Sequence, residues 1–301
     1  MEITADGTGK CGFRYADLMN DDVFKLVFGQ ESGTDVMKEF LNRVITDRNI
    51  VDLEFMDKEM RSVNRANKDS VYDMFCRTDD GSRIIVEVQR RKQDFYVDRT
   101  IYYSTFQIRN QIERGADEYE LYPVYVVNIL DFDMDENKGN PDVKTVFRLY
   151  EENSHALLTD KLTIIYLEIG KFKKTLEELD GDILEGIYFC LKNIHELDSR
   201  PAVFEHDVFK NIFYMSELVE MDEYTRSKVL QKMTTERDLR NQMAYAKRIA
   251  IAEGLAEGRA EGRAEGLEEA SRRMLAAGML PEKVSEILGI PVSGAKVLME
   301  E

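Results

Sequence analysis

Cysteine, histidine and long apolar runs are all scarce in this chain of 301 residues, and each shortage excludes a class of protein. The three cysteines, at positions 11, 76 and 190, are odd in number, widely spaced and without a CxxC pair. This pattern is typical of a cytoplasmic protein whose cysteines are reduced and not of a disulfide framework. The three histidines, at positions 155, 195 and 206, are scattered, which disfavours a zinc site or a histidine-based catalytic triad.

No stretch approaches the ~18 consecutive apolar residues that a membrane-spanning helix needs. The first ten residues, MEITADGTGK, also lack the apolar core of a signal peptide. We therefore expect a soluble, cytoplasmic protein with no membrane partner. The length of the chain allows one large domain or two.

Positive charge is in deficit, because 41 Lys and Arg residues face 58 Asp and Glu residues and leave a net charge of −17. Such a surface repels nucleic acid as a whole, so any DNA contact requires a local basic patch. Residues 83–114 supply one, with seven cations against four anions and a local charge of +3. An ordinary solvated helix face stays open as the alternative. The cations are Arg83, Arg90, Arg91, Lys92, Arg99, Arg109 and Arg114.

The rest of the chain is organised around residues 70–92, SVYDMFCRTDDGSRIIVEVQRRK. Two apolar-rich segments, 70–78 and 82–90, flank Asp79-Asp80-Gly81, a composition typical of a hairpin turn in which glycine adopts a positive φ. Side chains alternate along a strand, so Asp73 lies on one face of the first strand, and Glu87 shares a face of the second with Gln89. These polar groups occupy positions where a buried strand would prefer Val or Ile.

The turn decides whether the two acids meet. A three-residue loop with Gly81 in the left-handed conformation places Thr78 opposite Ser82 and Asp73 opposite Glu87. A two-residue Asp-Gly turn would put the two carboxylates on opposite faces, since a slip of one residue flips every side chain. In the first case the two carboxylates repel and raise the pKa of one of them unless a divalent cation lies between them. Hard oxygen ligands at that separation suit Mg²⁺ or Mn²⁺.

The order of the remaining elements predicts an α/β fold. Residues 17–44 favour two helices joined by a short loop, residues 50–60 a strand, and residues 95–114 a helix that stops at Gly115. Residues 121–132, LYPVYVVNILDF, predict a buried strand, parallel to a neighbour through the helical crossover. Residues 143–150 and 161–169 favour two further strands at the edge of the sheet.

Strands stop near residue 175, and the chain becomes helical. Residues 175–196, 204–220 and 223–251 predict helices, the last of them long and highly charged. We expect four regions: a disordered N-terminus at 1–14, an α/β domain at 15–175, a helical region at 176–250, and a tail at 251–301.

The tail contains an internal repeat of Ala-Glu-Gly followed by Leu or Arg, from Ala252 to Leu267. On a helix, a period of four gives slowly drifting stripes, and four glycines cost roughly 1 kcal/mol each relative to alanine. Close packing of the Ala/Gly face against another helix would offset that cost, whereas a frayed tether is the alternative. After the repeat, Pro281, Gly289 and Ser293 predict a short helical hairpin. With only two lysines, it suits protein contact better than DNA reading.

Taken together, an acid on one strand, Glu-x-Gln on the next, and a helix with Arg and Tyr resemble the PD-(D/E)XK nuclease superfamily. Within it, the chain resembles the transposase-related, or recombination-promoting, nucleases over residues 17–175 and in its tail. A single acid followed by Glu-x-Gln is a weak signal, whereas the ordered set is specific. The matching segments are Asp22-Val-Phe-Lys25, Phe40-Leu-Asn42, Asp73, Glu87-Val-Gln89, Arg99-x-x-x-Tyr103, 123–132 and Leu167-Glu-Ile-Gly-Lys171.

The resemblance implies a PD-(D/E)XK core, a mixed central sheet flanked by helices, followed by a helical C-terminal region. It also implies roles for residues. Asp73 and Glu87 would hold Mg²⁺ or Mn²⁺, with the Val88 carbonyl as a third ligand, and Gln89 would orient the attacking water. Gln89 replaces the superfamily's more usual lysine and brings no charge. Further candidates for DNA contact or support are Asp22, Lys25, Arg90, Arg91, Arg99 and Tyr103.

The resemblance thus implies a metal-dependent DNA endonuclease that acts in transposition or recombination. The alternative is a weak or inactive nuclease fold that serves as a DNA- or protein-binding module. In either case we expect a homodimer or higher homo-oligomer formed through the C-terminal helices.

Overall fold

The computed structural model describes residues 13–56, 59–60, 70–112 and 118–294. The predicted disordered N-terminus lies outside this part of the chain except for Phe13 and Arg14, and Arg14 is fixed by an ion pair with Glu217 (2.9 Å). Cys11 and Arg114 also lie outside it, whereas Cys76 and Cys190 are buried thiols that form no disulfide in the described chain. The chain forms two compact units, Met1–Thr234 and Thr235–Glu301, which are described separately below.

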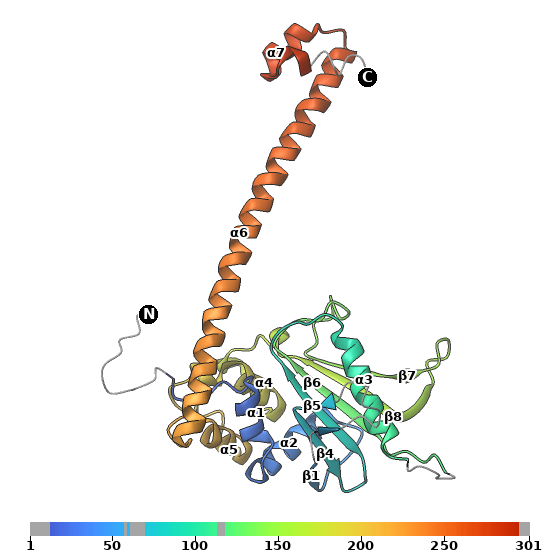
Figure 1. Ribbon diagram of the computed structural model, residues 1–301, viewed down its shortest axis with the longest axis vertical. Coiled ribbons are helices and arrows are strands. Elements are labelled where there is room, and N and C mark those ends of the chain that lie inside the picture. Colours follow the sequence, from blue (N-terminus) through green and yellow to red (C-terminus); the bar gives the residue numbers. More distant parts are fainter. Residues whose placement is uncertain (1–12, 57–58, 61–69, 113–117, 295–301) are drawn as a thin grey trace, which may run out of the picture. The chain divides into compact units, whose positions relative to one another are not determined.

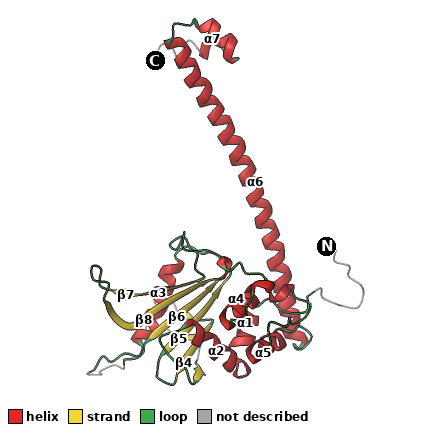
Figure 2. Cartoon of the chain, turned by 180° about the vertical axis from the view of Figure 1, so that it is seen from behind, coloured by secondary structure: helices red, strands yellow, loops and turns green. Residues whose placement is uncertain are grey.

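A mixed sheet of six strands is the centre of the first unit (Figure 2), and its strand order is β1-β4-β5-β6-β8-β7. The pairs β5–β6 and β6–β8 are parallel and the other pairs are antiparallel. A separate ladder joins β2 to β3. The bounds are β1 Leu53–Phe55, β2 Glu59–Met60, β3 Ser70–Val71, β4 Met74–Thr78, β5 Arg83–Gln89, β6 Val124–Leu130, β7 Lys144–Tyr150 and β8 Leu157–Glu168.

Helices cover both faces of this sheet (Figure 1). On one face, Cys76, Val86 and Val127 share a buried core with the apolar sides of α1, α2, α4 and α5. On the other face, Phe75, Ile85 and Val126 form a smaller cluster under α3. The helix bounds are α1 Asp21–Phe28, α2 Thr34–Val44, α3 Tyr96–Arg109, α4 Ile183–Asn193 and α5 Asp207–Ser216. Short 3-10 turns span Glu31–Gly33, Ile169–Lys171, Leu176–Glu178 and Ile194–Glu196.

Local chemistry explains where α1 begins. The Asn20 side chain accepts a hydrogen bond from the Asp22 backbone N–H, which satisfies one of the donors that a helix N-terminus leaves unpaired. Val23, Phe24, Val27 and Phe28 then place a continuous apolar side against the core. The polar side of the same helix is left to carry Asp21, Asp22 and Lys25.

Most of the predicted elements are confirmed, with shifted ends. The helix expected at 95–114 ends at Arg109, where Asn110 caps it, and the predicted stop at Gly115 lies outside the described residues. β8 lies inside the sheet between β6 and β7, so the expectation that both late strands form the edge is wrong for β8. The reason is the apolar segment from Ile164 to Leu167, which pairs in parallel with β6 over its whole length.

The predicted helical region beyond residue 175 contributes to the same core as the sheet. Ile187 and Leu191 of α4 and Ile212 of α5 are fully buried there. The long helix α6, Glu223–Ala276, begins in this unit, where Val229 is buried. The boundaries that the sequence suggested at 175 and 250 remain predictions.

In the second unit, α6 continues without interruption through the whole Ala-Glu-Gly repeat. At Gly254, Gly258, Gly262 and Gly266, an added β-carbon would meet no atom within 4 Å, so the glycine stripe faces open space. The helix α7, Pro281–Leu288, begins with proline and ends at Gly289, whose φ of 67° suits glycine. The rest of the predicted hairpin, from residue 295, lies outside the described residues. Across the described chain, no helix has both the length and the apolar character needed to cross a membrane.

Candidate functional site

The turn between β4 and β5 brings the two predicted acids together. Gly81 has a φ of 82°, and the Thr78 and Ser82 backbones pair across the loop with an N–H to O distance of 3.0 Å. The strand register that follows pairs Phe75 with Ile85 and Met74 with Val86. Continuing this register by one residue puts Asp73 opposite Glu87. The three-residue loop is therefore confirmed, and the two-residue alternative is wrong.

Asp73 lies in a bend between β3 and β4. One carboxylate oxygen of Asp73 accepts a hydrogen bond from the Val88 backbone N–H (2.9 Å). The other lies 2.8 Å from the ammonium of Lys25 on α1. The Asp73 carboxylate thus lies between the backbone of β5 and the polar side of α1.

Glu87 is 8% exposed and is poorly compensated. Burial raises the pKa of Glu87 to about 8, and the charge of Asp73 adds to the rise, while Arg99 and Lys25 oppose it. The only hydrogen bond described for its carboxylate is a long one, from the Asp73 backbone N–H at 3.4 Å. At neutral pH Glu87 therefore retains its proton, in agreement with the predicted repulsion between two neighbouring carboxylates.

α1 brings a cation and a further acid to this pair. Burial lowers the pKa of Lys25, but the hydrogen bond and charge of Asp73 outweigh it, so the net pKa is raised and the ammonium stays charged. Burial and then the charge of Asp73 raise the pKa of Asp21, which places this acid in the same electrostatic field. Sequence reasoning missed Asp21, since nothing in the pattern separates it from its neighbour Asp22.

Asp22 itself serves another contact. Its carboxylate forms ion pairs with Lys228 (3.2 Å) and with Lys232, one turn apart at the start of α6. Burial raises the pKa of Asp22, but these two lysines outweigh it and the net pKa is lowered. Asp22 therefore braces α1 against α6.

From the opposite face of the sheet, α3 supplies Arg99. Its guanidinium donates to the side-chain oxygens of Gln89 (2.9 Å) and Gln93 (2.7 Å). It also lies over the rings of Tyr96 and Tyr103, at 4.8 and 5.8 Å from their centroids. The amide nitrogen of Gln89 donates to the Arg91 carbonyl (2.9 Å), so both polar ends of Gln89 are used within the protein. Gln89 thus fixes a positive charge beside the acids.

The other basic residues of the predicted patch do not lie together in the structure. Arg90 turns inward and forms a buried ion pair with Asp17, which links the end of β5 to the segment before α1. Arg91 and Lys92 are exposed, and Lys92 pairs with Asp135. Arg83 lies at the far end of β5, where it bonds the Gln107 carbonyl (3.2 Å). The expected single patch over residues 83–114 is therefore divided between the two ends of the sheet.

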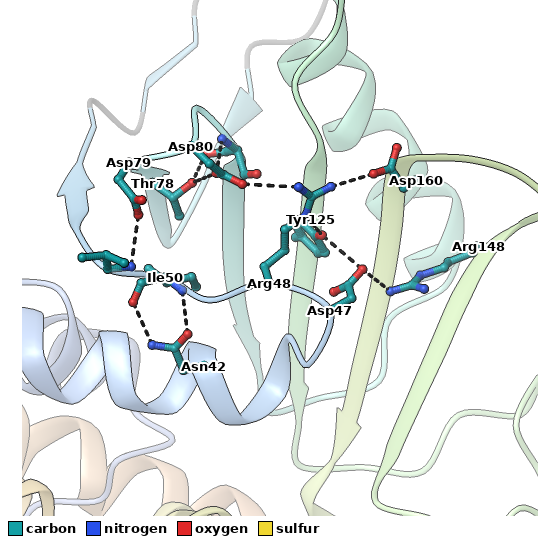
Figure 3. A network of polar contacts seen from close by, with 12 residues as sticks. Asn42, Asp47, Arg48, Ile50, Thr78, Asp79, Asp80, Tyr125, Arg148 and Asp160 are labelled. Atoms are coloured by element: carbon teal, nitrogen blue, oxygen red, sulfur yellow. Dashed lines mark hydrogen bonds and ion pairs between the residues drawn. The ribbon is translucent and has the colours of Figure 1, made fainter.

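Two other segments that resemble the nuclease family form hydrogen-bond networks within the protein. Glu168 is fully buried and accepts hydrogen bonds from the Met134 backbone N–H (2.7 Å) and from Lys171 (2.8 Å). Asn42 exchanges two hydrogen bonds with the Ile50 backbone, at 2.8 and 2.9 Å (Figure 3). These polar groups are satisfied within the protein, which suits bracing and not catalysis.

The acid pair fits a divalent cation. Asp73 and Glu87 present carboxylate oxygens, the donors that Mg²⁺ and Mn²⁺ prefer, and their mutual repulsion is what a dication would neutralise. In the described part of the chain, no cluster of three or more His, Cys, Asp or Glu side chains could hold a metal ion. Backbone and water ligands would have to complete the coordination, and the Val88 carbonyl remains the predicted candidate.

An α/β core in which a hairpin presents Asp and Glu-x-Gln at one end of a mixed sheet is the arrangement of a PD-(D/E)XK nuclease fold. The family model described as "PD-(D/E)XK nuclease family transposase" matches residues 18–246. The chain belongs to that family, which confirms the resemblance inferred from the sequence. No curated protein and no solved structure matches the chain.

Proposed function

We propose that this protein is a metal-dependent DNA endonuclease that hydrolyses phosphodiester bonds during transposition or recombination. The supporting observation is the pairing of Asp73 with Glu87, where burial and the charge of Asp73 raise the pKa of Glu87 to about 8. An acid whose pKa is strongly shifted by burial and by a specific charged neighbour is a candidate functional residue.

Asp73 and Glu87 would hold the cation. A bound divalent ion would lower the pKa of a water molecule and stabilise negative charge on the phosphate under attack. Lys25 and Arg99 bring positive charge from the two faces of the sheet to the same place, so both can stabilise that phosphate. In this proposal they supply the charge that Gln89 lacks, and Gln89 acts by holding Arg99 in position.

One observation favours a second candidate. The Lys25 ammonium already occupies one oxygen of Asp73 at 2.8 Å and could serve as a permanent internal cation. A chain that uses Lys25 in this way would bind DNA without cutting it.

Incubation of supercoiled plasmid with the full-length protein and Mg²⁺ or Mn²⁺ separates the two candidates. We expect nicking by the wild type and none by Asp73→Ala or Glu87→Gln. Asp35→Ala, at an exposed position on α2, is the control and should cut normally. Plasmid that stays intact with wild-type protein, while DNA binding persists, would support the binding module.

We also propose that the tail assembles copies of the chain. An isolated helix with four glycines is marginal in water, and the open stripe at Gly258 and Gly262 would let a second backbone approach closely. Replacing both glycines with leucine should shift the protein toward monomer in analytical ultracentrifugation, although it raises helix propensity. A wild-type protein that is monomeric at tens of micromolar would contradict this assembly.

A further inference from the structure

Phe95, the residue before α3, departs from three ordinary preferences at once. Its φ of 60° and ψ of 29° place a non-glycine residue in the left-handed region, which costs conformational energy. It occupies the N-cap position, where Ser, Thr, Asp and Asn are preferred, and it makes no capping hydrogen bond. Its ring is 79% exposed. Burial and folding therefore give no reason for a phenylalanine at this position.

Phe95 is linked to the strand that carries Glu87 through Arg99. The Phe95 carbonyl accepts the Arg99 backbone N–H (3.0 Å), one helical turn further along. The Arg99 side chain contacts Gln89, two residues beyond Glu87 on the same strand. One helical turn rises about 5 Å, and successive nucleotides are about 3.4 Å apart along one strand. Phe95 thus lies within a few nucleotides of a phosphate held at the acids.

The surroundings of the ring suit nucleic acid better than a protein partner. Arg91, Lys92, Gln93 and Asp94, which lead from β5 to Phe95, are all exposed and none is apolar. These four residues add nothing to a contiguous apolar patch of the kind that a protein interface needs. Arg91 and Lys92, the latter in an exposed ion pair with Asp135, precede an exposed aromatic ring, and exposed cations beside such a ring are the combination by which proteins bind unpaired bases.

We propose that Phe95 is a stacking platform for an unpaired or extruded base of the DNA substrate, next to the phosphate that a cation bound at Asp73 and Glu87 would hold. This role depends on the proposed function, and it narrows the substrate to DNA with a locally unpaired strand. The left-handed backbone at Phe95 projects the ring from the start of α3, and the conformational cost is the reason to expect a role for it. Stacking of one base is typically worth a tenfold or greater change in affinity.

The test compares binding of the full-length protein to two labelled duplexes, one fully paired and one with a three-nucleotide bulge, by fluorescence anisotropy in EDTA. Without metal the measurement does not depend on cleavage, so its outcome is separate from that of the plasmid assay. For Phe95→Asn, we expect roughly a tenfold loss of affinity for the bulged duplex and little change for the paired one. Phe95→Trp should keep the wild-type preference.

Thermal unfolding of the same variants provides the second measurement. Asparagine tolerates the left-handed region and is a good N-cap, so Phe95→Asn should raise the melting temperature while it weakens bulge binding. Tyr119→Asn is the matched control, because the Tyr119 ring is 81% exposed in the loop before β6. This variant should alter neither the melting temperature nor the affinity for the bulged duplex.

Three results would overturn the proposal: equal affinity of wild type and Phe95→Asn for the bulged duplex, an equal loss for both duplexes, or no DNA binding by the wild type. A change in the sedimentation of the protein alone on Phe95→Asn, with DNA binding unchanged, would assign the ring to a protein interface instead. Bulge binding that depends on Phe95 in a protein that never nicks plasmid would uphold this inference and refute the nuclease.

Discussion

The two ends of the β4–β5 hairpin carry similar charged residues in opposite electrostatic conditions. At the turn, Asp79 accepts hydrogen bonds from the Val51 and Asp52 backbones, at 3.1 and 3.2 Å, and these lower its pKa. Burial raises the pKa of Asp80, but hydrogen bonds from Thr78 and Ser82 outweigh it and leave the net pKa lowered. At the open end, the pKa of Glu87 is raised to about 8. The charges at the turn are compensated, whereas those at the open end are compensated only in part.

Figure 3 shows how the compensated end is built. Arg48 bridges Asp80 (3.4 Å) and Asp160 (2.6 Å) and donates to the Tyr125 hydroxyl (3.0 Å). Arg148, on the adjoining strand β7, pairs with Asp47 at 2.5 Å. Each of these cations meets a carboxylate, and the network joins α2, the hairpin and the last strands. Compensated charges of this kind hold elements together, whereas uncompensated ones leave a binding role open.

The largest expected difference between the ends is in catalysis. Asp73→Ala removes a proposed metal ligand and should reduce plasmid nicking on the order of a thousand-fold, because a metal ion supplies several kcal/mol of transition-state stabilisation. Asp80→Asn, at the turn, should change the nicking rate by no more than a few-fold at a temperature where the protein is folded. Initial rates over a range of Mg²⁺ concentrations check both. Similar losses for the two variants would remove the functional distinction between the ends.

Folding stability should rise on substitution of the acid pair, although catalysis is lost, and should fall on substitution at the turn. The ordinary pKa of a glutamate, 4.5, is raised to about 8 in the folded state, so the folded state holds the proton more tightly. The stability contributed by neutral Glu87 is complete below pH 4.5 and is lost as the pH rises to about 8. At pH 8 in EDTA, Glu87→Gln should therefore stabilise the protein by a few kcal/mol and flatten its pH dependence.

Asp80→Asn should destabilise the protein by about 1 kcal/mol at the same pH, because it weakens the bonds to Ser82 and Arg48. Urea unfolding of both variants between pH 5 and 9 checks the contrast, with Glu205→Gln, at an exposed position, as the control. Destabilisation by Glu87→Gln at pH 8 would mean that the glutamate is compensated after all.

The pairing of Asp73 with Glu87 could be predicted from the sequence because it depends on residues that are near one another in the chain. Only a residue that tolerates a positive φ suits the third position of the turn, and Gly81 therefore determined the register that brings Asp73 to Glu87. The parallel pairing of β5 and β6 also followed from the helical crossover between them. Strand alternation and turn geometry involve neighbours in sequence, so a pattern can reveal them.

Contacts between distant elements could not be predicted in this way. Asp21 and Asp22 are adjacent, and only the fold turns one toward Asp73 and the other toward the lysines of α6. The family resemblance implied that Gln89 orients water, which stays a prediction, and the pattern did not show that its amide bonds Arg99 and the Arg91 carbonyl. Similarly, nothing in the pattern around Phe95 indicates its left-handed backbone.

A smaller effect concerns Lys25, the cation that partly compensates the open end. Lys25→Met removes the ammonium from Asp73, so a divalent cation no longer has to displace it and should bind about tenfold more tightly. Nicking should nevertheless slow, because the phosphate loses a positive charge. Calorimetric titration with Mn²⁺ measures the affinity, and Lys38→Met, which breaks an ordinary pair with Asp35 on α2, is the control. Weaker metal binding by Lys25→Met would show that Lys25 supports the metal site and does not compete with it.

The central claim is that Glu87, beside Asp73, holds a proton at neutral pH that a divalent cation displaces. Calorimetric titration of the protein with Mg²⁺ at pH 7, in two buffers of different ionisation enthalpy, counts the protons released per ion bound. With the pKa of Glu87 at about 8, the wild type should release close to one proton and Glu87→Gln should release none. Binding by the wild type without proton release, or unchanged binding by Glu87→Gln, would contradict the account.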